Sequence, residues 1–412
     1  MTLGAFRIRS FRFQFASDLL TSWAFEMETV ILGWYIMVNT GSVLWLTAFG
    51  SLQFLGTLAA PLFGLLGDRL GGRSVLCAMR VVYSALAAAL MVLALTGRLA
   101  PVWVVALATV VGIVRPNDLV LRNTLIGETI PGPLRIGALG MSRATMDSAR
   151  VGGALVGAAL STVLGIGATY VFVTTFYLAS LALTFGVARR PPLAAPAPIA
   201  VPGASSWIEL KAGLARVARA PGLLAMVLLA FLINLTAYPV SGGLLPYAAQ
   251  RVYGVDATGL GLLVASFALG GLLASIAMVV TGGPRHPERA TLVGTAIWYG
   301  LLLGFGHLAT MTAGLLTLFV AGFVQNVVMI AMSAVLLGAA GVGFRGRVMG
   351  VRMLAVYGLP LGLLGSGFLI ERIGYPGTIS VSAALGLAGT ALVGLRWRAA
   401  MWRARPAAAT WT

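Results

Sequence analysis

Two carboxylates lie two residues apart in an otherwise apolar stretch near the start of the chain. The stretch TSWAFEMETVILGWYIMV spans residues 21–38 and contains Glu26 and Glu28. A charged side chain in hydrocarbon is costly unless it is paired or faces water, so such residues mark ion pathways or buried pairs. Because each helical residue turns by 100°, the two side chains point about 200° apart. We expect Glu26 to bind a proton or substrate or else to form a structural pair, and Glu28 either to share the first role or to hydrogen-bond a neighbouring helix.

Arginine and aspartate recur at helical spacing in two later stretches. The first holds Arg115, Asp118 and Arg122, and the second holds Arg143, Asp147 and Arg150. Each aspartate is one turn from both arginines of its set, so each set is expected on one face of a helix. Each set is either an internally neutralised structural cluster or part of a charge-lined gate. Asp18, near the start of the chain, is expected to be solvated or paired with an arginine.

Uncharged polar residues within apolar stretches form a further group. They are Gln53, Asn234, Tyr238, Gln325 and Asn326. Each can line a binding cavity or make a hydrogen bond between helices, and the sequence leaves both interpretations open.

Residues that would indicate an enzyme are absent from the sequence. His286 and His307 lack metal-ligand spacing with another histidine, cysteine or acid, and the phosphate-binding pattern G-x-x-x-x-G-K-[ST] does not occur. The only cysteine, Cys77, cannot form an intrachain disulfide. We therefore expect no catalytic activity, no metal site and no cofactor.

The composition places these polar residues in a membrane protein. The 412 residues are 59% hydrophobic and only 9% charged, whereas soluble domains average about 25% charged residues. The net charge of +17 comes from arginines scattered between apolar runs, a pattern that argues against nucleic-acid binding.

Hydropathy predicts twelve membrane-spanning helices, since a span needs about 20 apolar residues. They lie near 13–39, 44–66, 75–97, 101–125, 137–163, 168–188, 222–246, 259–281, 290–308, 311–339, 349–370 and 376–395. Of the 28 basic residues, only Arg98, Arg251 and Arg372 fall on the outer side if the chain begins in the cytoplasm. The positive-inside rule then predicts a multi-pass protein of the plasma (inner) membrane with both termini in the cytoplasm.

A polar segment divides the spans into two groups of six. Residues 188–204 form a linker rich in proline and alanine, and SWIELKAGLARVARA, which follows, is typical of an amphipathic helix on the inner membrane surface. The predicted parts are an N-terminal six-helix half (1–188), a cytoplasmic linker with this helix (189–221), a C-terminal six-helix half (222–396) and a basic cytoplasmic tail (397–412).

The loop between the second and third spans carries the most specific motif. GLLGDRLGGRSVL, residues 64–76, resembles the G-x-x-x-D-R-x-G-R-[RK] loop of the major facilitator superfamily, with Asp68, Arg69 and Arg73 at matching positions. The resemblance implies an all-α membrane fold of two six-helix halves. It also implies that this loop holds the two halves together in one state of the transport cycle, with Asp68 near the N-terminal end of the eleventh span.

Other residues resemble the proton-coupled drug and siderophore exporter branch, which includes macrolide-type and enterobactin exporters. They are Arg115-Pro116, the stretch NLTAYPVSGGLLP and RGRVMG at 345–350. In the aligned first span, Glu26 falls where that branch usually has an aspartate. The glycine-rich stretch RVGGALVG (150–157) resembles the antiporter motif of exporters, with Gly153 in place of its proline.

We therefore expect a secondary transporter that exports a small molecule by proton antiport. Its expected partners are the substrate, protons and membrane lipids, and it is expected to be a monomer. A siderophore, lipid or metabolite carrier of the same fold is the alternative. A further alternative is a membrane-embedded lipid-modifying enzyme or a non-transporting scaffold. An enzyme would need convergent nucleophile or metal-ligand residues, and a scaffold would not need carboxylates within its spans.

Overall fold

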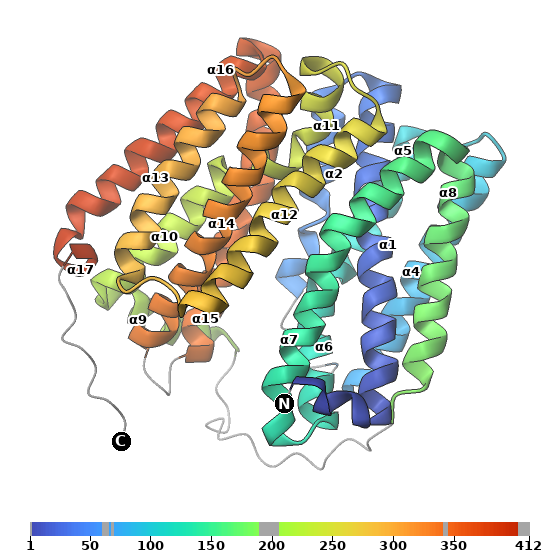
Figure 1. Ribbon diagram of the computed structural model, residues 1–412, viewed down its shortest axis with the longest axis horizontal. Coiled ribbons are helices and arrows are strands. Elements are labelled where there is room, and N and C mark those ends of the chain that lie inside the picture. The colour runs from blue at the N-terminus through green and yellow to red at the C-terminus, as the bar shows by residue number, and fades with distance from the viewer. Residues whose placement is uncertain (1, 60–65, 67–69, 189–205, 341–344, 403–412) are drawn as a thin grey trace. The chain divides into compact units, whose positions relative to one another are not determined.

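The computed structural model describes residues 2–59, 66, 70–188, 206–340 and 345–402. All regular secondary structure in this part of the chain is helical (Figure 1). Seven of the described helices are long and apolar enough to cross a membrane, judged by length and composition. The predicted motif residues Asp68 and Arg69 lie outside the described residues. So do residues 189–205, the part of the predicted linker that precedes its helix, and residues 403–412 of the predicted tail.

The chain divides into two compact units, and each is described by itself. The N-terminal unit comprises Met1–Val201 and Gly243–Ala265, and the C-terminal unit comprises Pro202–Gly242 and Ser266–Thr412. The N-terminal unit contains η1 (Thr2–Arg7), α1 (Arg9–Thr40), α2 (Val43–Leu52), η2 (Leu55–Ala59), α4 (Gly72–Leu95), α5 (Pro101–Val114), η3 (Arg115–Asn117), α6 (Asp118–Thr129), α7 (Gly132–Ser148), η4 (Ala149–Gly153), α8 (Ala154–Phe185), α11 (Leu245–Tyr247) and η6 (Ala248–Val252).

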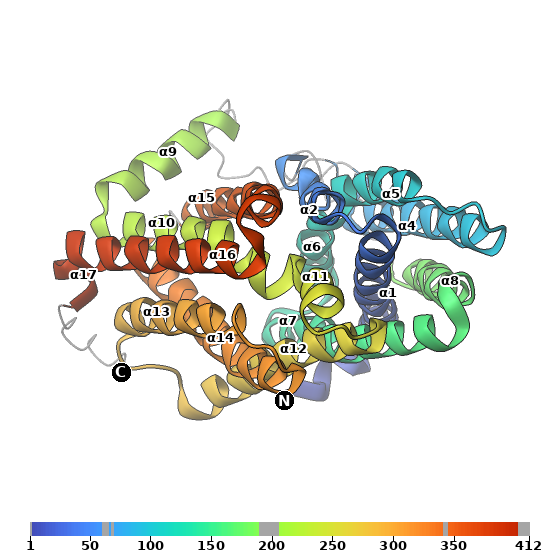
Figure 2. The same cartoon turned by 90° about the horizontal axis from the view of Figure 1, so that it is seen from above.

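Helix α1 occupies the centre of the N-terminal unit. It packs against α8 and α7, and α8 also packs along α4, as Figure 2 shows from above. The helix ends at Gly41, whose φ of 60° and N–H bond to the Met37 carbonyl form a left-handed cap. Its buried residues lie on several faces of the helix, which explains why the polar residues of α1 contact other helices.

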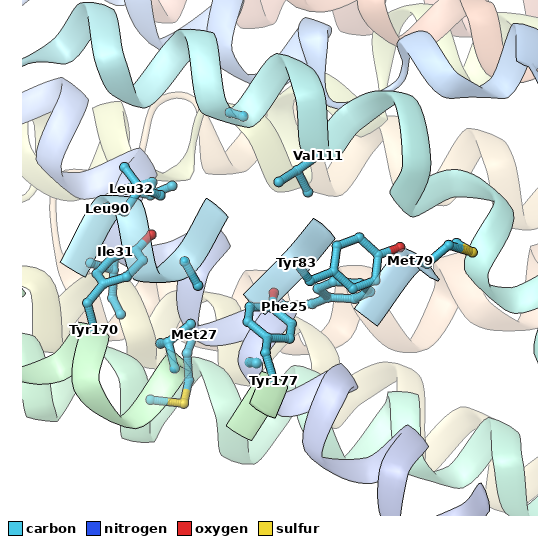
Figure 3. Packing of buried hydrophobic residues seen from close by; sticks show 14 of the residues in the cluster. Phe25, Met27, Ile31, Leu32, Met79, Tyr83, Leu90, Val111, Tyr170 and Tyr177 are labelled. Atoms are coloured by element: carbon cyan, nitrogen blue, oxygen red, sulfur yellow. The ribbon is translucent and has the colours of Figure 1, made fainter. Parts of the chain in front are cut away.

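The core around α1 combines aromatic rings with close backbone contacts. The ring of Phe25 meets that of Tyr83 edge-on at 4.9 Å and lies 5.7 Å from that of Tyr177 (Figure 3). A Cβ atom at Gly157 of α8 would lie only 2.8 Å from the Met27 Cα atom. Glycine at this position therefore allows α8 to approach the backbone of α1, as small residues do between membrane helices.

The C-terminal unit contains α9 (Ser206–Arg219), α10 (Pro221–Thr236), all of η5 (Pro239–Gly243) except Gly243, α13 (Pro287–Phe305), α14 (Met311–Ala340), α15 (Arg345–Leu354), η8 (Ala355–Tyr357), α16 (Gly358–Arg396) and α17 (Arg398–Trp402). Helix α12 (Ala257–Thr281) begins in the N-terminal unit and ends in this one. Helices α13 and α14 pack side by side, and α16 packs against α10 and α13. α9 coincides with the predicted amphipathic helix and packs against α15.

Helices α8 and α16 are each interrupted by one glycine, and each interruption falls between two predicted spans. Gly165 in α8 has φ 77° and ψ 167°, and Gly374 in α16 has φ 73° and ψ 173°. Side chains disfavour this conformation, so glycine is the residue that can break the helix there. The breaks fall between the predicted spans 137–163 and 168–188, and between 349–370 and 376–395.

Candidate functional site

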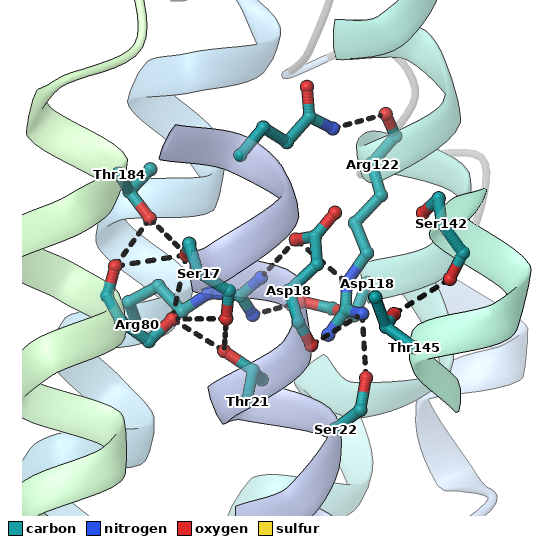
Figure 4. A network of polar contacts seen from close by, with 12 residues as sticks. Ser17, Asp18, Thr21, Ser22, Arg80, Asp118, Arg122, Ser142, Thr145 and Thr184 are labelled. Carbon is teal, nitrogen blue, oxygen red and sulfur yellow. Dashed lines mark hydrogen bonds and ion pairs between the residues drawn. The ribbon is translucent and has the colours of Figure 1, made fainter. Parts of the chain in front are cut away.

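Four buried charged residues meet at one point in the N-terminal unit. They are Asp18 of α1, Arg80 of α4, and Asp118 and Arg122 of α6, and each is at most 4% exposed (Figure 4). Asp18 Oδ1 lies 3.2 Å from Arg80 Nη2 and 3.3 Å from Arg122 Nε, and both arginines also pair with Asp118. The formal charges cancel. Because a buried charge is stable only when it is paired and hydrogen-bonded, this cluster joins α1, α4 and α6 rigidly.

The composition of this cluster differs from the predicted set of Arg115, Asp118 and Arg122. Asp118 pairs with Arg122 as expected, but Arg115 hydrogen-bonds Thr29 and Gln53 and does not join the cluster. The α-helix stops at Val114 and the turn Arg115–Asn117 is a 3₁₀ segment. Arg115 finds its partners on α1 and beside α2. The partner of Asp118 that the sequence prediction missed is Arg80, which stands out in the sequence as a lone arginine within an apolar span.

Arg115 points toward the middle of α1. Its Nη1 donates to Thr29 Oγ1 at 2.9 Å and to Gln53 Oε1 at 3.1 Å, and its guanidinium lies 4.4 Å from the centroid of the Phe25 ring. Of the predicted cavity residues, Gln53 is therefore a direct hydrogen-bond partner of this arginine.

Glu28 is buried between α1 and the second half of α8. Tyr170 donates a hydrogen bond to Glu28 Oε1 at 3.3 Å, and Tyr177 donates to Oε2 at 3.0 Å. The two tyrosines are seven residues apart and so share one face of the helix, a pattern visible in the sequence. Glu28 and Arg115 also line one cavity of about 10 Å³, which has room for about one water molecule.

Glu26 lies in a different environment on α1. Its side chain is partly exposed, and the described residues offer its carboxylate neither a hydrogen bond nor an ion pair. A Cβ atom at Gly153 would lie 3.2 Å from Glu26 Cβ, and one at Gly152 would lie 2.8 Å from the ring of Trp23. Both glycines belong to η4, a π-helical turn, and such turns are frequent at functional sites. The glycine-rich stretch RVGGALVG thus packs on the face of α1 that carries Glu26.

The π-helical turn also explains why the second predicted set is incomplete. Arg143 Nε lies 3.7 Å from Asp147 Oδ1, with 52% of the arginine side chain exposed. Arg150 is exposed and forms no ion pair within the described part of the chain. Spacing in a regular α-helix would place Asp147 and Arg150 on one face, but η4 begins at Ala149 and widens the turn between them. No ion pair links Arg150 to Asp147 in the described part of the chain, and their position on one face stays a prediction.

Of the predicted motif loop, Arg73 is the charged residue that the structure describes. It donates hydrogen bonds to the carbonyl oxygens of Phe185 at 2.7 Å and Thr184 at 3.4 Å. Both carbonyls lie in the last turn of α8, where basic side chains commonly satisfy unpaired carbonyl groups. Arg73 thereby ties the start of α4 to the end of α8.

The polar residues of the C-terminal unit fall into separate contacts. Gln325 donates to the Tyr238 hydroxyl at 2.8 Å, whereas Asn326 donates to Ser275 Oγ at 2.6 Å and joins α14 to α12. Asn234 donates to the Ala230 carbonyl of its own helix. Arg352 of α15, which the sequence analysis did not single out, donates to Ser333 Oγ at 3.0 Å.

A larger cavity lies at the opposite end of α1 from Asp18, within the N-terminal unit. Its volume is about 260 Å³, and its lining includes Trp34, Tyr35, Asn39, Thr162 and Asp256. Pockets for drug-sized ligands usually occupy about 300–1,000 Å³, so this cavity is slightly smaller than a typical binding site.

Comparisons with known proteins identify the architecture. Sequence features of the Major Facilitator Superfamily match residues 15–283. A comparison with curated protein sequences gave no match. The human organic anion transporter MFSD10 (TETRAN) has a similar structure, with 19% sequence identity, a TM-score of 0.65, and coverage of 93% of this chain and 99% of that chain.

Two further solved structures share the fold. A POT family transporter in complex with 5-aminolevulinic acid has 12% identity and a TM-score of 0.71, and the match covers 95% of this chain and 97% of that chain. A bacterial homolog of the human lysosomal transporter Spinster, in an inward-facing and unoccupied conformation, has 17% identity, a TM-score of 0.67 and 95% coverage of both chains. The predicted all-helical membrane fold is therefore confirmed over nearly the whole chain.

The fold similarity, the apolar helices and the family match over residues 15–283 lead to one conclusion. The chain belongs to the Major Facilitator Superfamily, and it is a multi-pass membrane protein that acts as a secondary transporter of small molecules and not as an enzyme.

Proposed function

We propose that this transporter exports a small molecule across the plasma (inner) membrane in exchange for protons, as the drug and siderophore exporters that it resembles do. The observation that carries this proposal is the contrast between two carboxylates of α1. Glu28 accepts hydrogen bonds from two tyrosines, whereas Glu26 is partly exposed and unpaired among the described residues. A carboxylate without a fixed partner can gain and lose a proton without breaking buried contacts.

In the proposed cycle, Glu26 takes up a proton from the outer side and releases it to the cytoplasmic side. Protonation removes the charge of the side chain and with it much of the cost of holding it in a low-dielectric region. Substrate binding on the cytoplasmic side displaces the proton, so the downhill movement of protons drives export. Alternating access of a site near the bilayer midplane is the expected mechanism of this fold.

The π-helical turn η4 contributes to this proposal because it contacts the same face of α1. Glycines 152 and 153 bring the backbone of η4 against Trp23 and Glu26. A π turn packs less regularly than an α-helix and often marks a functional position. We propose that movement of η4 changes the access of water to Glu26 during the cycle.

Glu28 and Arg115 have a positioning role in this proposal. The hydrogen bonds from Tyr170 and Tyr177 fix the Glu28 carboxylate between α1 and α8, and hydrogen bonds to a charged acceptor are stronger than neutral ones. Arg115 holds Thr29 of α1 and Gln53 together. Both residues thus orient α1, on which Glu26 lies.

A carrier for a siderophore, a lipid or a metabolite is the second candidate function. MFSD10 is an organic anion transporter, and the POT family transporter was solved in complex with 5-aminolevulinic acid. Arg352, which has no acidic partner among the described residues, favours a substrate with a negative group.

Reconstituted transport distinguishes these candidates. The purified protein would be incorporated into liposomes that contain a pH-sensitive dye, and a macrolide, a catechol siderophore and an amphipathic cationic dye would be added in turn. The proposal predicts proton flux that depends on one of these compounds, and uphill substrate movement when a pH gradient is imposed. Transport that responds to no pH gradient would contradict the proton-coupled mechanism while leaving the fold assignment intact.

A further inference from the structure

Carboxylates are distributed unevenly between the two units. The C-terminal unit has Glu209, Glu288 and Glu371 as its acidic residues. Glu288 lies at the start of α13 and Glu371 is exposed on α16, and the side chain of Glu209 lies outside the described residues. In the N-terminal unit, by contrast, Arg80 and Arg122 each contact two aspartates. An arginine within the C-terminal unit therefore has few acids of its own unit available to neutralise it.

Arg352 is such an arginine. It lies in the last turn of α15 and is partly buried. Its Nη1 donates to Ser333 Oγ at 3.0 Å, and its Nη2 lies 3.9 Å from the sulfur of Met329. The titratable group that interacts with it is the phenol of Tyr238, and no carboxylate of the described residues forms an ion pair with it. An unpaired charge is costly in a low-dielectric region.

The contacts of Arg352 leave most of its donors available. A guanidinium group carries five N–H donors. Among the described residues, Nη1 of Arg352 donates to an oxygen, that of Ser333, and Nη2 contacts the sulfur of Met329. Arg352 is only partly buried, so part of its side chain can be reached from outside the protein. The nearby Gln325–Tyr238 pair adds uncharged polar groups from α14 and from the residues after α10.

We infer that Arg352 binds an oxyanion, a carboxylate or phosphate group, in the C-terminal unit. Arginine suits this ligand because its planar fork can donate two parallel hydrogen bonds to one carboxylate or phosphate. Ser333 then orients the guanidinium. The oxyanion belongs either to the transported substrate, in which case the inference rests on the proposed transport function, or to the headgroup of an anionic lipid.

Binding of soluble anions tests the inference independently of transport. The purified protein in phosphatidylcholine vesicles would be titrated with inorganic phosphate, citrate and benzoate, and its thermal unfolding would be followed by tryptophan fluorescence. At least one anion should raise the unfolding temperature of the wild type, and Arg352→Gln should weaken the apparent affinity about tenfold or more. Arg352→Lys, which keeps the charge but loses the fork, should fall between the two. Arg372→Gln, which removes an exposed arginine beside Phe368 in the same unit, is the matched control and should behave as the wild type.

A second arm uses lipids in place of soluble anions. The same variants would be measured in vesicles with and without phosphatidylglycerol. If stabilisation by this anionic lipid is lost in Arg352→Gln and retained in Arg372→Gln, the ligand is a lipid headgroup. If only the soluble anions show the Arg352 dependence, the ligand is a substrate. A failure of the transport assays alone would contradict the proposed function and leave this result unaffected.

Two outcomes would overturn the inference. One is an identical response of wild type, Arg352→Gln and Arg352→Lys to every anion and to the lipid. The other concerns Glu209 of α9, since α9 packs against α15. The family resemblance also places Asp68 near the N-terminal end of the eleventh span, where Arg352 lies. If anion binding is absent in the wild type and appears in Glu209→Gln or in Asp68→Asn, that acid already neutralises Arg352 and the site is an internal ion pair.

Discussion

Arg80 and Asp118 are 38 residues apart in the sequence and form an ion pair in which both side chains are at most 5% exposed. Each partner also contacts a second charged residue, Asp18 for Arg80 and Arg122 for Asp118. The pair therefore belongs to a closed set of two cations and two anions. Its buried position makes each member dependent on the others, because removal of one charge leaves another unpaired.

Asp118→Asn should strongly destabilise the protein. The substitution leaves Arg80 and Arg122 with one carboxylate between them, and loss of one partner of a buried pair costs about 3–5 kcal/mol. The effect would be measured as the free energy of unfolding in a denaturant titration of purified protein. Asp147→Asn is the matched control, because its arginine partner is largely exposed and such pairs contribute about 1 kcal/mol or less. An equal loss of unfolding free energy in the two variants would contradict the conclusion that the ion pairs of Asp118 are buried and that of Asp147 is exposed.

Hydropathy and glycine positions were sufficient to predict much of the fold. Apolar runs of about 20 residues indicated the spans, and the helices break at Gly165 and Gly374, between predicted spans. These features are local, since the length of an apolar run and the conformational freedom of glycine are visible in one segment of sequence. The family motif added the two-half architecture.

The partners of the charged residues could not be predicted in the same way. Spacing along one helix placed Arg115 with Asp118, but the structure gives Asp118 a partner from α4 and directs Arg115 toward Thr29. Spacing also assumed a regular helix at Arg150, where the chain forms a π turn. Contacts between helices depend on how each helix is rotated, and a single sequence does not contain this information.

Glu28→Gln should lower stability while transport is retained. The amide keeps one carbonyl acceptor but replaces the other with an NH₂ group, so one of the two tyrosine hydrogen bonds is lost. The loss of a buried hydrogen bond to a charged group costs about 1.5–3 kcal/mol. Tyr177→Phe removes the shorter bond and should have a similar effect on the unfolding free energy. If both variants remain as stable as the wild type but fail to couple protons, Glu28 and not Glu26 carries the proton.

Gly322→Ala should disrupt the packing of α14 against α12. A Cβ atom at Gly322 would overlap the carbonyl oxygen of Phe267, and this backbone atom cannot move independently of its helix. Overpacking of this kind costs about 1–3 kcal/mol or more. Gly300→Ala of α13 is the control, since a Cβ atom there meets nothing within 4 Å. The unfolding temperature of both variants would be compared, and a similar loss in both would contradict the close approach of the two helices.

Asp68→Asn tests the motif loop, whose aspartate lies outside the described residues. Its resemblance to the family loop GLLGDRLGGR predicts that Asp68 stabilises one state of the transport cycle. The variant should insert and fold normally but transport more slowly. Initial transport rates in proteoliposomes with matched protein content would show the effect, and Arg12→Gln, a charge change outside the motif, provides the control. An unchanged rate in Asp68→Asn would exclude this role.

Glu26→Gln should abolish proton-driven export while leaving the protein stable. The amide cannot exchange a proton, so a pH gradient no longer drives substrate uphill, whereas exchange of substrate down its own gradient can continue. Because the described residues make no hydrogen bond or ion pair to the Glu26 carboxylate, the substitution breaks no contact of the kind that holds Glu28. Reconstituted transport with an imposed pH gradient and thermal unfolding of the same preparation would be measured together. Glu26→Asp, which keeps the carboxyl group, should restore part of the coupling, and a Glu26→Gln protein that still concentrates substrate would show that another residue couples transport to protons.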